Sequence, residues 1–463
     1  MPTDRLATLE HGSADWWVEK LGSALSKRLT DVLQQEKYYE GAHPLKFMTD
    51  RFRDAFGGMF RQFADNWCEL VVDAVEERLS VQGFRFGEDP EADKDAWTIW
   101  QHNNMDAESK IAHIEALKHG VAYVLVEGDG RTPRITAEHP AQMIVAHEPG
   151  NRRRREAALK AWVEDDGHAV VTLWLPDSVL KYRSKGKVET GAKAWDSIGN
   201  NLEQTDEASN PVQVVPVVPI VNRPSIMRPW GKSEIANIIP TQDAVNKLVV
   251  DMMIAAHFAA FKQKWATGLE IPTNEDGTPV EAFKEAVDRV WTSAAPDTKF
   301  GEFEATDLSQ YVQAIEMLVQ HIASQTRTPP HYFFLRGSFP SGESIKTAET
   351  GLVAKSKDRM VHFGEAWEEA MRLAFAVGGD ARANEIAAET IWGDPETRTE
   401  SEMVDAAVKR KAIGVPDEQL WEDIGYTPSQ TRRFEAMRLR STLLTPVAAT
   451  GASDAEPASA AGS

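Results

Sequence analysis

Residues of the kinds that do chemistry are present in this chain, but their spacing matches none of the common catalytic patterns. The twelve histidines never form the His-Glu-x-x-His pattern of a zinc site, and His113 and His119, six residues apart, fall on different helix faces. Ser341-Gly-Glu-Ser344 places a serine beside a glutamate, yet no strand precedes it as a nucleophile elbow requires. No Gly-x-x-x-x-Gly-Lys-Ser/Thr loop is present to bind nucleotide phosphates. We therefore predict no catalytic residue, metal ligand or cofactor site, and the chain is not expected to be an enzyme.

The run Arg152–Arg155 is the one stretch that resembles a nucleic-acid patch. It follows a Glu-Pro-Gly-Asn turn, and Glu156 lies directly beside it. A solvated turn or an intersubunit ion-pair site is favoured over a nucleic-acid site for these arginines.

The charge balance excludes a conventional tight nucleic-acid binder. Lys plus Arg number 51 against 71 Asp plus Glu, which gives a formal net charge of -20. Such a surface repels phosphate backbones. The one cysteine, Cys68, rules out an intrachain disulfide and lies among apolar residues, so a buried thiol and a reducing cytoplasm are expected.

The length and composition predict a folded protein of two or more domains. The chain has 463 residues, of which 42% are hydrophobic and 26% charged. Met1–Ala14 has no apolar core like that of a signal peptide, and no run of about 18 apolar residues occurs. Neither export by a visible signal nor a membrane span is expected.

The first half of the chain reads as an α+β domain. Helical spacing of apolar residues predicts helices over 15–35, 63–79 and, as a pair, 96–119. From Val121 the period changes, and short strands are expected as far as Arg183. Residues 184–211 are polar and rich in Gly, Asn, Asp, Glu and Ser, which predicts an exposed loop.

A long apolar helix is the most informative element of the second half. Residues 241–265, which follow Pro240, contain neither Pro nor Gly. The middle of this segment, Leu248–Phe261, is apolar nearly all the way round. Such a helix needs neighbours on several sides. The central helix of a globular core and a helix packed on copies of itself stay equally open.

A small acidic unit follows, between this helix and a second one. Residues 268–305 carry nine acidic and three basic side chains, with a helix expected over 280–291 and a strand over 299–303. Asp307 then caps a helix over 308–325 with one apolar stripe. A long helix, an acidic unit and a returning helix therefore follow one another.

The rest of the chain is mainly helical. Pro329 and Pro330 end the returning helix, and glycines permit an irregular loop as far as Gly342. A long helix is expected to about Val377, then three short helices to about 441. The Ala-, Ser-, Gly- and Pro-rich segment 442–463 is expected to be a disordered tail.

This order of segments resembles the portal proteins of tailed double-stranded DNA phages, in the subfamily common among phages of Gram-positive and actinobacterial hosts. The resemblance extends from about Leu25 to Arg440, and each motif alone is weakly specific. The order and spacing of the motifs carry it, namely Tyr38–Phe47, Asn66–Leu79, Gly231–Ile235 with the apolar helix, Ile322–Phe333 and Ser341–Lys346.

The resemblance implies a mostly helical α+β fold with the wing, stem, clip and crown architecture of a ring-forming portal. Its segments would be a wing at 1–240, a stem helix at 241–267, a clip at 268–305, a stem helix at 306–326, a tunnel loop at 327–343, a long wing helix at 344–377, a crown at 378–441 and a tail at 442–463.

The resemblance also assigns roles to individual residues. The tunnel loop that faces DNA would present Arg327, Thr328, Arg336, Ser338 and Lys346. The clip that docks the terminase and adaptor would present Glu270, Asn274, Glu275, Asp276, Glu281 and Glu285. The stem would pack through Leu248, Met252, Met253, Ala259 beside Phe258, Val312, Ile315 and Val319.

An acidic channel agrees with that function, because each phosphate paired with Lys or Arg adds affinity and slows sliding. Basic residues near the loop are expected to make brief phosphate contacts and to lie nearer the axis than most other bases. A solvated loop without DNA contact stays the alternative.

The implied partners are sister copies in a ring of about twelve subunits, the terminase large subunit, the head-to-tail adaptor, major capsid and scaffold proteins, and double-stranded DNA that passes through without sequence preference. No membrane is implied. The ring would sit at one capsid vertex of the virion after assembly in the host cytoplasm. A hydrolase has no supporting pattern, and another capsid-associated head protein of low oligomeric state is the alternative.

Overall fold

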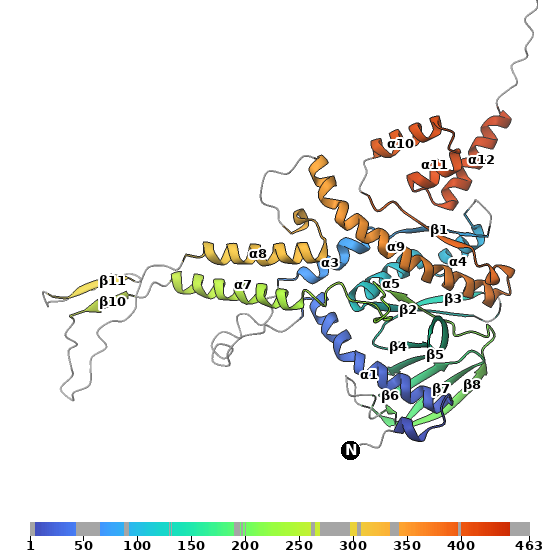
Figure 1. Cartoon of the computed structure of the whole chain (residues 1–463), viewed down its shortest axis with the longest axis horizontal. Helices are drawn as coiled ribbons and strands as arrows, with labels where there is room; N and C mark the ends of the chain where they lie inside the picture. Colours follow the sequence, from blue (N-terminus) through green and yellow to red (C-terminus); the bar gives the residue numbers. More distant parts are fainter. Residues whose placement is uncertain are drawn as a thin grey trace, which may run out of the picture. The chain divides into compact units, whose positions relative to one another are not determined.

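The structure, a computed structural model, describes residues 5–42, 65–87, 92–128, 130, 132–188, 195, 198–199, 201–260, 264–268, 297–302, 307–333, 342–396 and 400–444. The fold mixes helices and sheets (Figure 1). It divides into two compact units. Unit 1 comprises Met1–Thr30, Val75–Lys232 and Val353–Ser463, and unit 2 comprises Asp31–Ala74 and Ser233–Leu352.

A five-stranded antiparallel sheet forms the centre of unit 1, with the strand order β4-β5-β6-β7-β8. Its strands are β4 (Met143–Glu148), β5 (Asn151–Val163), β6 (His168–Trp174), β7 (Ser178–Lys187) and β8 (Leu202–Ser209). Side chains alternate between the two faces of a strand, so each face can meet a different layer. In β4, Ile144 packs with Trp16 and Leu21 of α1 (Ala14–Tyr39), on one face of the sheet.

The other face of this sheet meets a second sheet. Met143 and Val145, which alternate with Ile144, pack with Tyr123 and Leu125. These two belong to a three-stranded sheet of order β3-β2-β9, made by β2 (Val121–Gly128), β3 (Pro133–Glu138) and β9 (Val217–Val221). Unit 1 therefore buries both faces of its central sheet at β4, β5 and β6, whereas β8 at the edge is exposed.

The remaining elements of unit 1 pack around a ribbon of two distant strands, β1 (Val81–Phe86) and β12 (Ala388–Trp392). Trp367 of α9 (Gly342–Gly378) contacts Trp100 edge-on and donates its Nε1–H to His113 at 2.9 Å. The surrounding helices are α4 (Lys94–His102), α5 (Met105–His119), α10 (Glu400–Ala412), α11 (Asp417–Ile424) and α12 (Pro428–Leu444), with a short 3-10 turn at Ala381–Asn384. Another 3-10 turn, Arg5–Thr8, packs Leu6 against the core between α1 and the central sheet.

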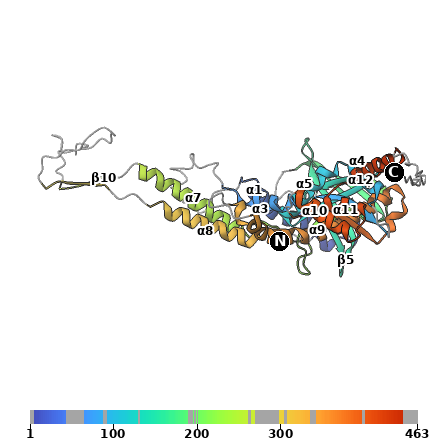
Figure 2. The ribbon, with the colours of Figure 1, turned by 90° about the horizontal axis from the view of Figure 1, so that it is seen from above.

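In unit 2, α7 (Ile239–Ala260) and α8 (Ser309–Thr326) run side by side (Figures 1 and 2). β10 (Lys264–Thr267) pairs antiparallel with β11 (Lys299–Glu302). A short 3-10 turn, η2 (Pro330–Tyr332), follows α8, and α3 (Trp67–Glu76) begins in this unit. Among the described residues, no helix is long and apolar enough to cross a membrane.

Three expectations from the sequence are wrong. The long helix ends at Ala260, because Lys264–Thr267 forms a strand rather than the last helical turn. Residues 184–211 are not simply a loop, because β7 continues to Lys187 and β8 begins at Leu202. The arginine run lies in β5 from Asn151 onward, although Arg152–Arg154 are exposed there. The helix expected over 280–291 lies outside the described residues.

Candidate functional site: the α7–α8 pair and the loop after it

Three buried polar side chains anchor the first half of α7. Gln242 accepts a hydrogen bond from the backbone N–H of Trp67 at 2.9 Å, and Asn246 accepts one from the N–H of Asp65 at 2.9 Å. Asp243 accepts one from the Tyr38 hydroxyl at 2.6 Å. Buried polar groups of this kind stabilise a fold only when they are paired, so these contacts fix the position and rotation of the helix.

Sequence reasoning missed these three anchors. Their signal is the polar cluster Gln242, Asp243 and Asn246 in a helix whose remaining turns are almost entirely apolar. Nothing in the sequence distinguishes a cluster that binds neighbouring backbone from one that faces water.

Away from the polar anchors, α7 and α8 carry apolar side chains that the rest of the chain does not fully cover. Val250 of α7 and Val319 and Ile322 of α8 are buried, at the end near the polar anchors. Farther along, Met253 is 38% exposed and Met317 is 51% exposed. The pair therefore leaves much of its apolar surface in contact with solvent.

The residues predicted to pack the stem follow the same gradient. Val319 is buried, Met253 is exposed, and the others with described side chains are half-buried, namely Leu248, Met252, Ala259, Val312 and Ile315. The side chain of Phe258 lies outside the described residues. The structure places these residues on two adjacent helices, and a single chain does not bury most of them.

The loop after α8 begins with an unusual backbone conformation. Arg327 ends the helix in the left-handed region, with φ 56°, and its side chain is exposed. Its neighbour Thr326 is buried and donates its hydroxyl to the Ile322 carbonyl at 2.8 Å. Thr328 is also buried, and its hydroxyl lies 3.0 Å from the Thr326 oxygen, to which it can donate. Arg327 is thus held outward between two buried threonines.

Only part of the predicted tunnel loop is described. Phe333 packs on Trp67 with ring centroids 5.3 Å apart, which ties the start of the loop to α3. Lys346 is exposed on the first turns of α9. Arg336 and Ser338 lie outside the described residues.

The acidic unit is described only through β10 and β11. Trp265 and Phe300 on these strands are 38% and 41% exposed. All six predicted docking residues lie outside the described residues, namely Glu270, Asn274, Glu275, Asp276, Glu281 and Glu285.

A cluster of possible metal ligands in unit 1 is better explained as a hydrogen-bonded hub. The Nε2 atoms of His119 and His139 lie 3.2 and 3.1 Å from Oε2 of Glu115. His139 accepts the backbone N–H of Ala141 at its Nδ1, so a neutral His139 carries its proton on Nε2 and cannot offer that nitrogen to a metal. The Lys118 ammonium lies 2.9 Å from the other carboxylate oxygen of Glu115 and supplies positive charge beside it.

Electrostatics within this hub favour a charged carboxylate. Burial alone would raise the pKa of Glu115, but hydrogen bonds from His119 and His139, together with the charge of Lys118, lower it well below its usual range. The hub therefore joins α5 to the segment before β4, where His139 lies.

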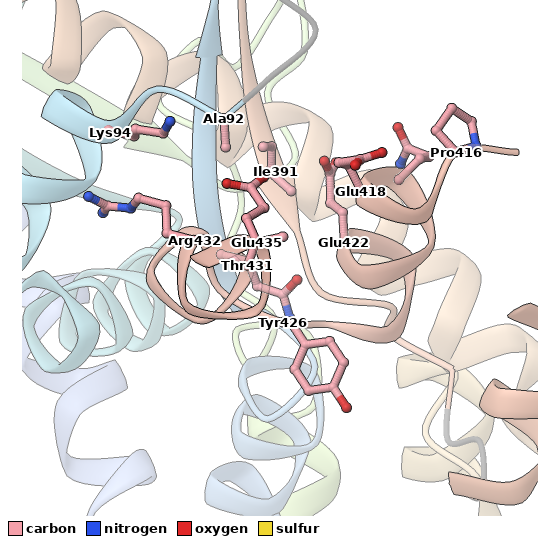
Figure 3. Close-up of a pocket in the computed structure, with 12 residues that line it drawn as sticks. Ala92, Lys94, Ile391, Pro416, Glu418, Glu422, Tyr426, Thr431, Arg432 and Glu435 are labelled. Carbon is pink, nitrogen blue, oxygen red and sulfur yellow. The ribbon is translucent and has the colours of Figure 1, made fainter. Parts of the chain in front are cut away.

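A cavity of about 310 Å³ lies between the C-terminal helices and the β1–β12 ribbon (Figure 3). Ala92 and Ile391 line it, and the carboxylates of Glu418, Glu422 and Glu435 turn toward the same space. Arg85 binds both oxygens of Glu422 at 3.0 Å. The lining also holds two bases, Lys94 and Arg432, and the Arg85–Glu422 ion pair links the ribbon to α11.

Two adjacent helices leave apolar side chains exposed, an acidic segment separates these helices in the sequence, and a proline-bearing loop follows them. Residues 19–426 match the family model described as "Phage portal protein, SPP1 Gp6-like". This match spans most of the chain, which therefore belongs to the phage portal protein family. Portal proteins are structural, non-enzymatic components of virions.

Two curated relatives are portal proteins of mycobacterial phages. The chain is 30% identical to the portal protein of Mycobacterium phage D29 over 381 residues, which cover 77% of this chain and 75% of the relative. It is likewise 30% identical to the portal protein of Mycobacterium phage L5 over 380 residues, with the same coverage. The sequence-based assignment to a subfamily found in actinobacterial phages is confirmed.

Solved structures with a similar chain come from gene transfer agent particles. One is from the neck of a native particle computed with C12 symmetry, with 12% identity and a TM-score of 0.45, covering 78% of this chain and 88% of the other. Another is from the neck of an empty particle computed with C6 symmetry, with 11% identity and a TM-score of 0.47, covering 84% and 96%.

Proposed function

We propose that copies of this chain assemble into a ring of about twelve subunits at one capsid vertex. The ring forms the channel for packaging and ejection of double-stranded DNA. It docks the terminase and the head-to-tail adaptor through the acidic segment 268–305, the clip. Residues 241–267 and 306–326 act as the stem, 327–343 as the tunnel loop, 378–441 as the crown, and the wing is built from 1–240 with 344–377.

The observation that carries this proposal is the uncovered apolar surface of the α7–α8 pair. Met253 and Met317 are exposed, and Val312 and Ile315 are only half-buried, although all four are apolar. Apolar side chains left uncovered along two adjacent helices are typical of an interaction site. Copies of the same pair, arranged around an axis, would bury it, whereas a globular core would have buried it within one chain.

Charge supports the channel function. A net charge of -20 disfavours tight binding to a polyanion, which suits DNA that must slide. Arg327 is exposed at the start of the proposed tunnel loop, where it makes brief phosphate contacts together with Lys346 and Arg336. The loop therefore binds DNA weakly and transiently.

The mass of the purified protein tests the assembly. Twelve copies of a 51.4 kDa chain weigh roughly 0.6 MDa. Light scattering and electron micrographs should reveal annular particles near that mass. Particles of one to a few subunits under all conditions would instead favour a head protein of low oligomeric state.

The loop is tested separately, in particles that have assembled. Charge reversal of Arg327 and Arg336 should change the DNA packaging rate and DNA retention, while ring mass stays the same. Reversal of Arg433, an exposed arginine of α12, is the matched control. Unchanged packaging and retention would assign the loop to a solvated surface without DNA contact.

A further inference from the structure

Two loops of unit 1 form a cationic surface on a chain that is strongly acidic overall. The tip of the β4–β5 hairpin presents Arg152, Arg153 and Arg154, and the loop after β9 presents Arg223 and Arg228. Arg152 donates to the Ser225 carbonyl at 3.4 Å, so the two loops lie together. We call these five arginines, with Ile226 and Met227, the basic projection; Figure 2 shows β5 extending out from the rest of its unit.

The backbone of the basic projection is preformed. Ser225 and Arg228 exchange two backbone hydrogen bonds of 3.1 Å across the loop, and the Ser225 hydroxyl accepts the N–H of Arg228 at 3.0 Å. At the base of the loop, Trp230 lies against His147 with ring centroids 5.7 Å apart. A surface that is already ordered loses little conformational entropy when it binds.

Most of its charge has no acidic partner within the described part of the chain. Arg154 lies 3.6 Å from Glu148, whereas Arg153, Arg223 and Arg228 form no ion pair with described residues. Arg155, which follows the tip, is different, because it binds Glu369 at 2.8 Å and is largely buried. The free arginines are thus a separate group from the structural one.

Two apolar side chains in the loop after β9 lie among the arginines of the basic projection. Ile226 is 86% exposed and Met227 is 88% exposed. Single exposed apolar residues are normal, but two adjacent ones amid arginines have the composition of a protein interface, where Arg and Met are enriched. DNA would use the arginines and leave these two side chains in water.

A complementary surface lies on the same unit, at the edge of the central sheet. β8 carries Glu203, Asp206 and Glu207, all exposed, and no basic residue. Lys181 of β7 lies 3.4 Å from Asp206. Among the described strands β8 pairs only with β7, so its outer edge is open to another chain.

We infer that the basic projection of one subunit docks on the acidic edge strand β8 of a second copy of this chain. The two surfaces are different patches of one chain, so the contact is head-to-tail and can close into a ring. It would fix the orientation of neighbouring wings independently of the α7–α8 contacts. This inference rests on the proposed ring and adds a second, polar contact to it.

Charge reversal tests the pairing in the full chain. Arg152→Glu with Arg153→Glu should weaken association at least about tenfold, or ~1.4 kcal/mol, at low salt. Glu203→Arg with Glu207→Arg should do the same, and the four changes combined should restore association. Arg433→Glu with Arg440→Glu, two exposed arginines of α12, is the matched control and should leave association unchanged. Equal association of all variants overturns the inference.

A cross-link tests proximity in assembled particles. Met227→Cys with Glu207→Cys should give a ladder of covalent oligomers on oxidation, whereas each single variant should give none beyond the wild-type background. The one native cysteine, Cys68, is fully buried. Ring-sized particles without a ladder overturn the inference and leave the proposed function standing; absence of ring-sized particles defeats the proposed function itself. Arginine variants that lose DNA binding while association is unchanged would assign the projection to nucleic acid and overturn the inference.

Discussion

The central sheet of unit 1 and the α7–α8 pair of unit 2 both carry apolar side chains, but the chain covers those side chains to different extents. In the sheet, Ile144 faces α1 and its neighbours Met143 and Val145 face the second sheet, so the apolar side chains of β4 are covered on both faces. Along α7 and α8, side chains such as Met253 and Met317 remain open. Unit 1 completes its core alone, and the uncovered helix surface marks where another molecule belongs.

The largest effect is expected when charged side chains are placed on the exposed apolar surface of α8. Val312→Asp with Ile315→Asp should reduce ring assembly at least about a hundredfold, or ~2.8 kcal/mol, because an unpaired carboxylate would be buried at each contact. The free energy of unfolding of the monomer should change far less, since both side chains are half-exposed there. Mass photometry and thermal unfolding measure the two quantities.

The control for these variants uses exposed positions at the covered end of the same helix, where Ile322 and Thr326 are buried. Ser324→Asp with Gln325→Asp adds the same charge at two exposed positions of α8 and should leave assembly intact. Equal loss of assembly in both pairs would mean that charge alone acts, and that the half-buried side chains of α8 are not an interface.

The second prediction concerns a fully buried side chain in the core of unit 1. Leu173→Ala removes a fully buried side chain between the sheet and α1, and should lower the free energy of unfolding by about 2–5 kcal/mol. The chains that remain folded should still assemble. Denaturant unfolding measures the loss, with Val361→Ala, at a 64% exposed position of α9, as the control. A loss of assembly by folded Leu173→Ala chains would contradict the separation of the two regions.

The third prediction concerns how the free energy of unfolding depends on pH through two histidines of unit 1. Burial, with the nearby Lys110 charge, lowers the pKa of His113 to about 3, and burial with the Arg155 charge lowers that of His147 to about 4. A depressed histidine pKa means that unfolding takes up protons below the unfolded value of about 6.5. Stability is therefore full above pH 6.5 and falls as pH drops, by roughly 1.5 kcal/mol for His113 alone at pH 5.

Denaturant unfolding at pH 6.5 and pH 5 measures this loss. His113→Gln keeps an acceptor for the Trp367 indole but cannot be protonated, so its stability should depend less on pH. An unchanged slope in this variant would show that His113 is not buried in its neutral form.

The order of helices in both regions could be predicted from sequence, but not all of their boundaries. The helices of 309–326 and 342–378 agree with expectation because periodicity, prolines and caps are local signals. The first long helix stops at Ala260 because Lys264–Thr267 pairs with Lys299–Glu302, and such pairing overrides local preference. The strands Val81–Phe86 and Ala388–Trp392 were missed because they pair across some 300 residues of chain.

The prediction of site residues also depended on whether the signal was local in the sequence or came from distant segments. β8 was taken for loop because an edge strand exposed on both faces has no alternation of polar and apolar residues to read. The half-covered stem residues were predicted correctly as helical and apolar, but their exposure depends on what the rest of the chain leaves uncovered. The basic projection was readable only as an arginine run, since Ile226, Met227 and Arg228 join it through space.

The smallest effect is expected at the covered end of α8, where the helix meets the proposed tunnel loop. Arg327 has φ 56°, a conformation that costs a side chain with a Cβ roughly 1 kcal/mol and costs glycine little. Arg327→Gly should therefore raise the free energy of unfolding by about 0.5 kcal/mol, whereas Arg327→Ala, which keeps the Cβ, should not. Denaturant unfolding resolves the pair, and DNA retention in assembled particles should fall in both, because both lose the charge. A stabilised Arg327→Gly ring with undiminished DNA retention would remove the reason to place an arginine where glycine fits better.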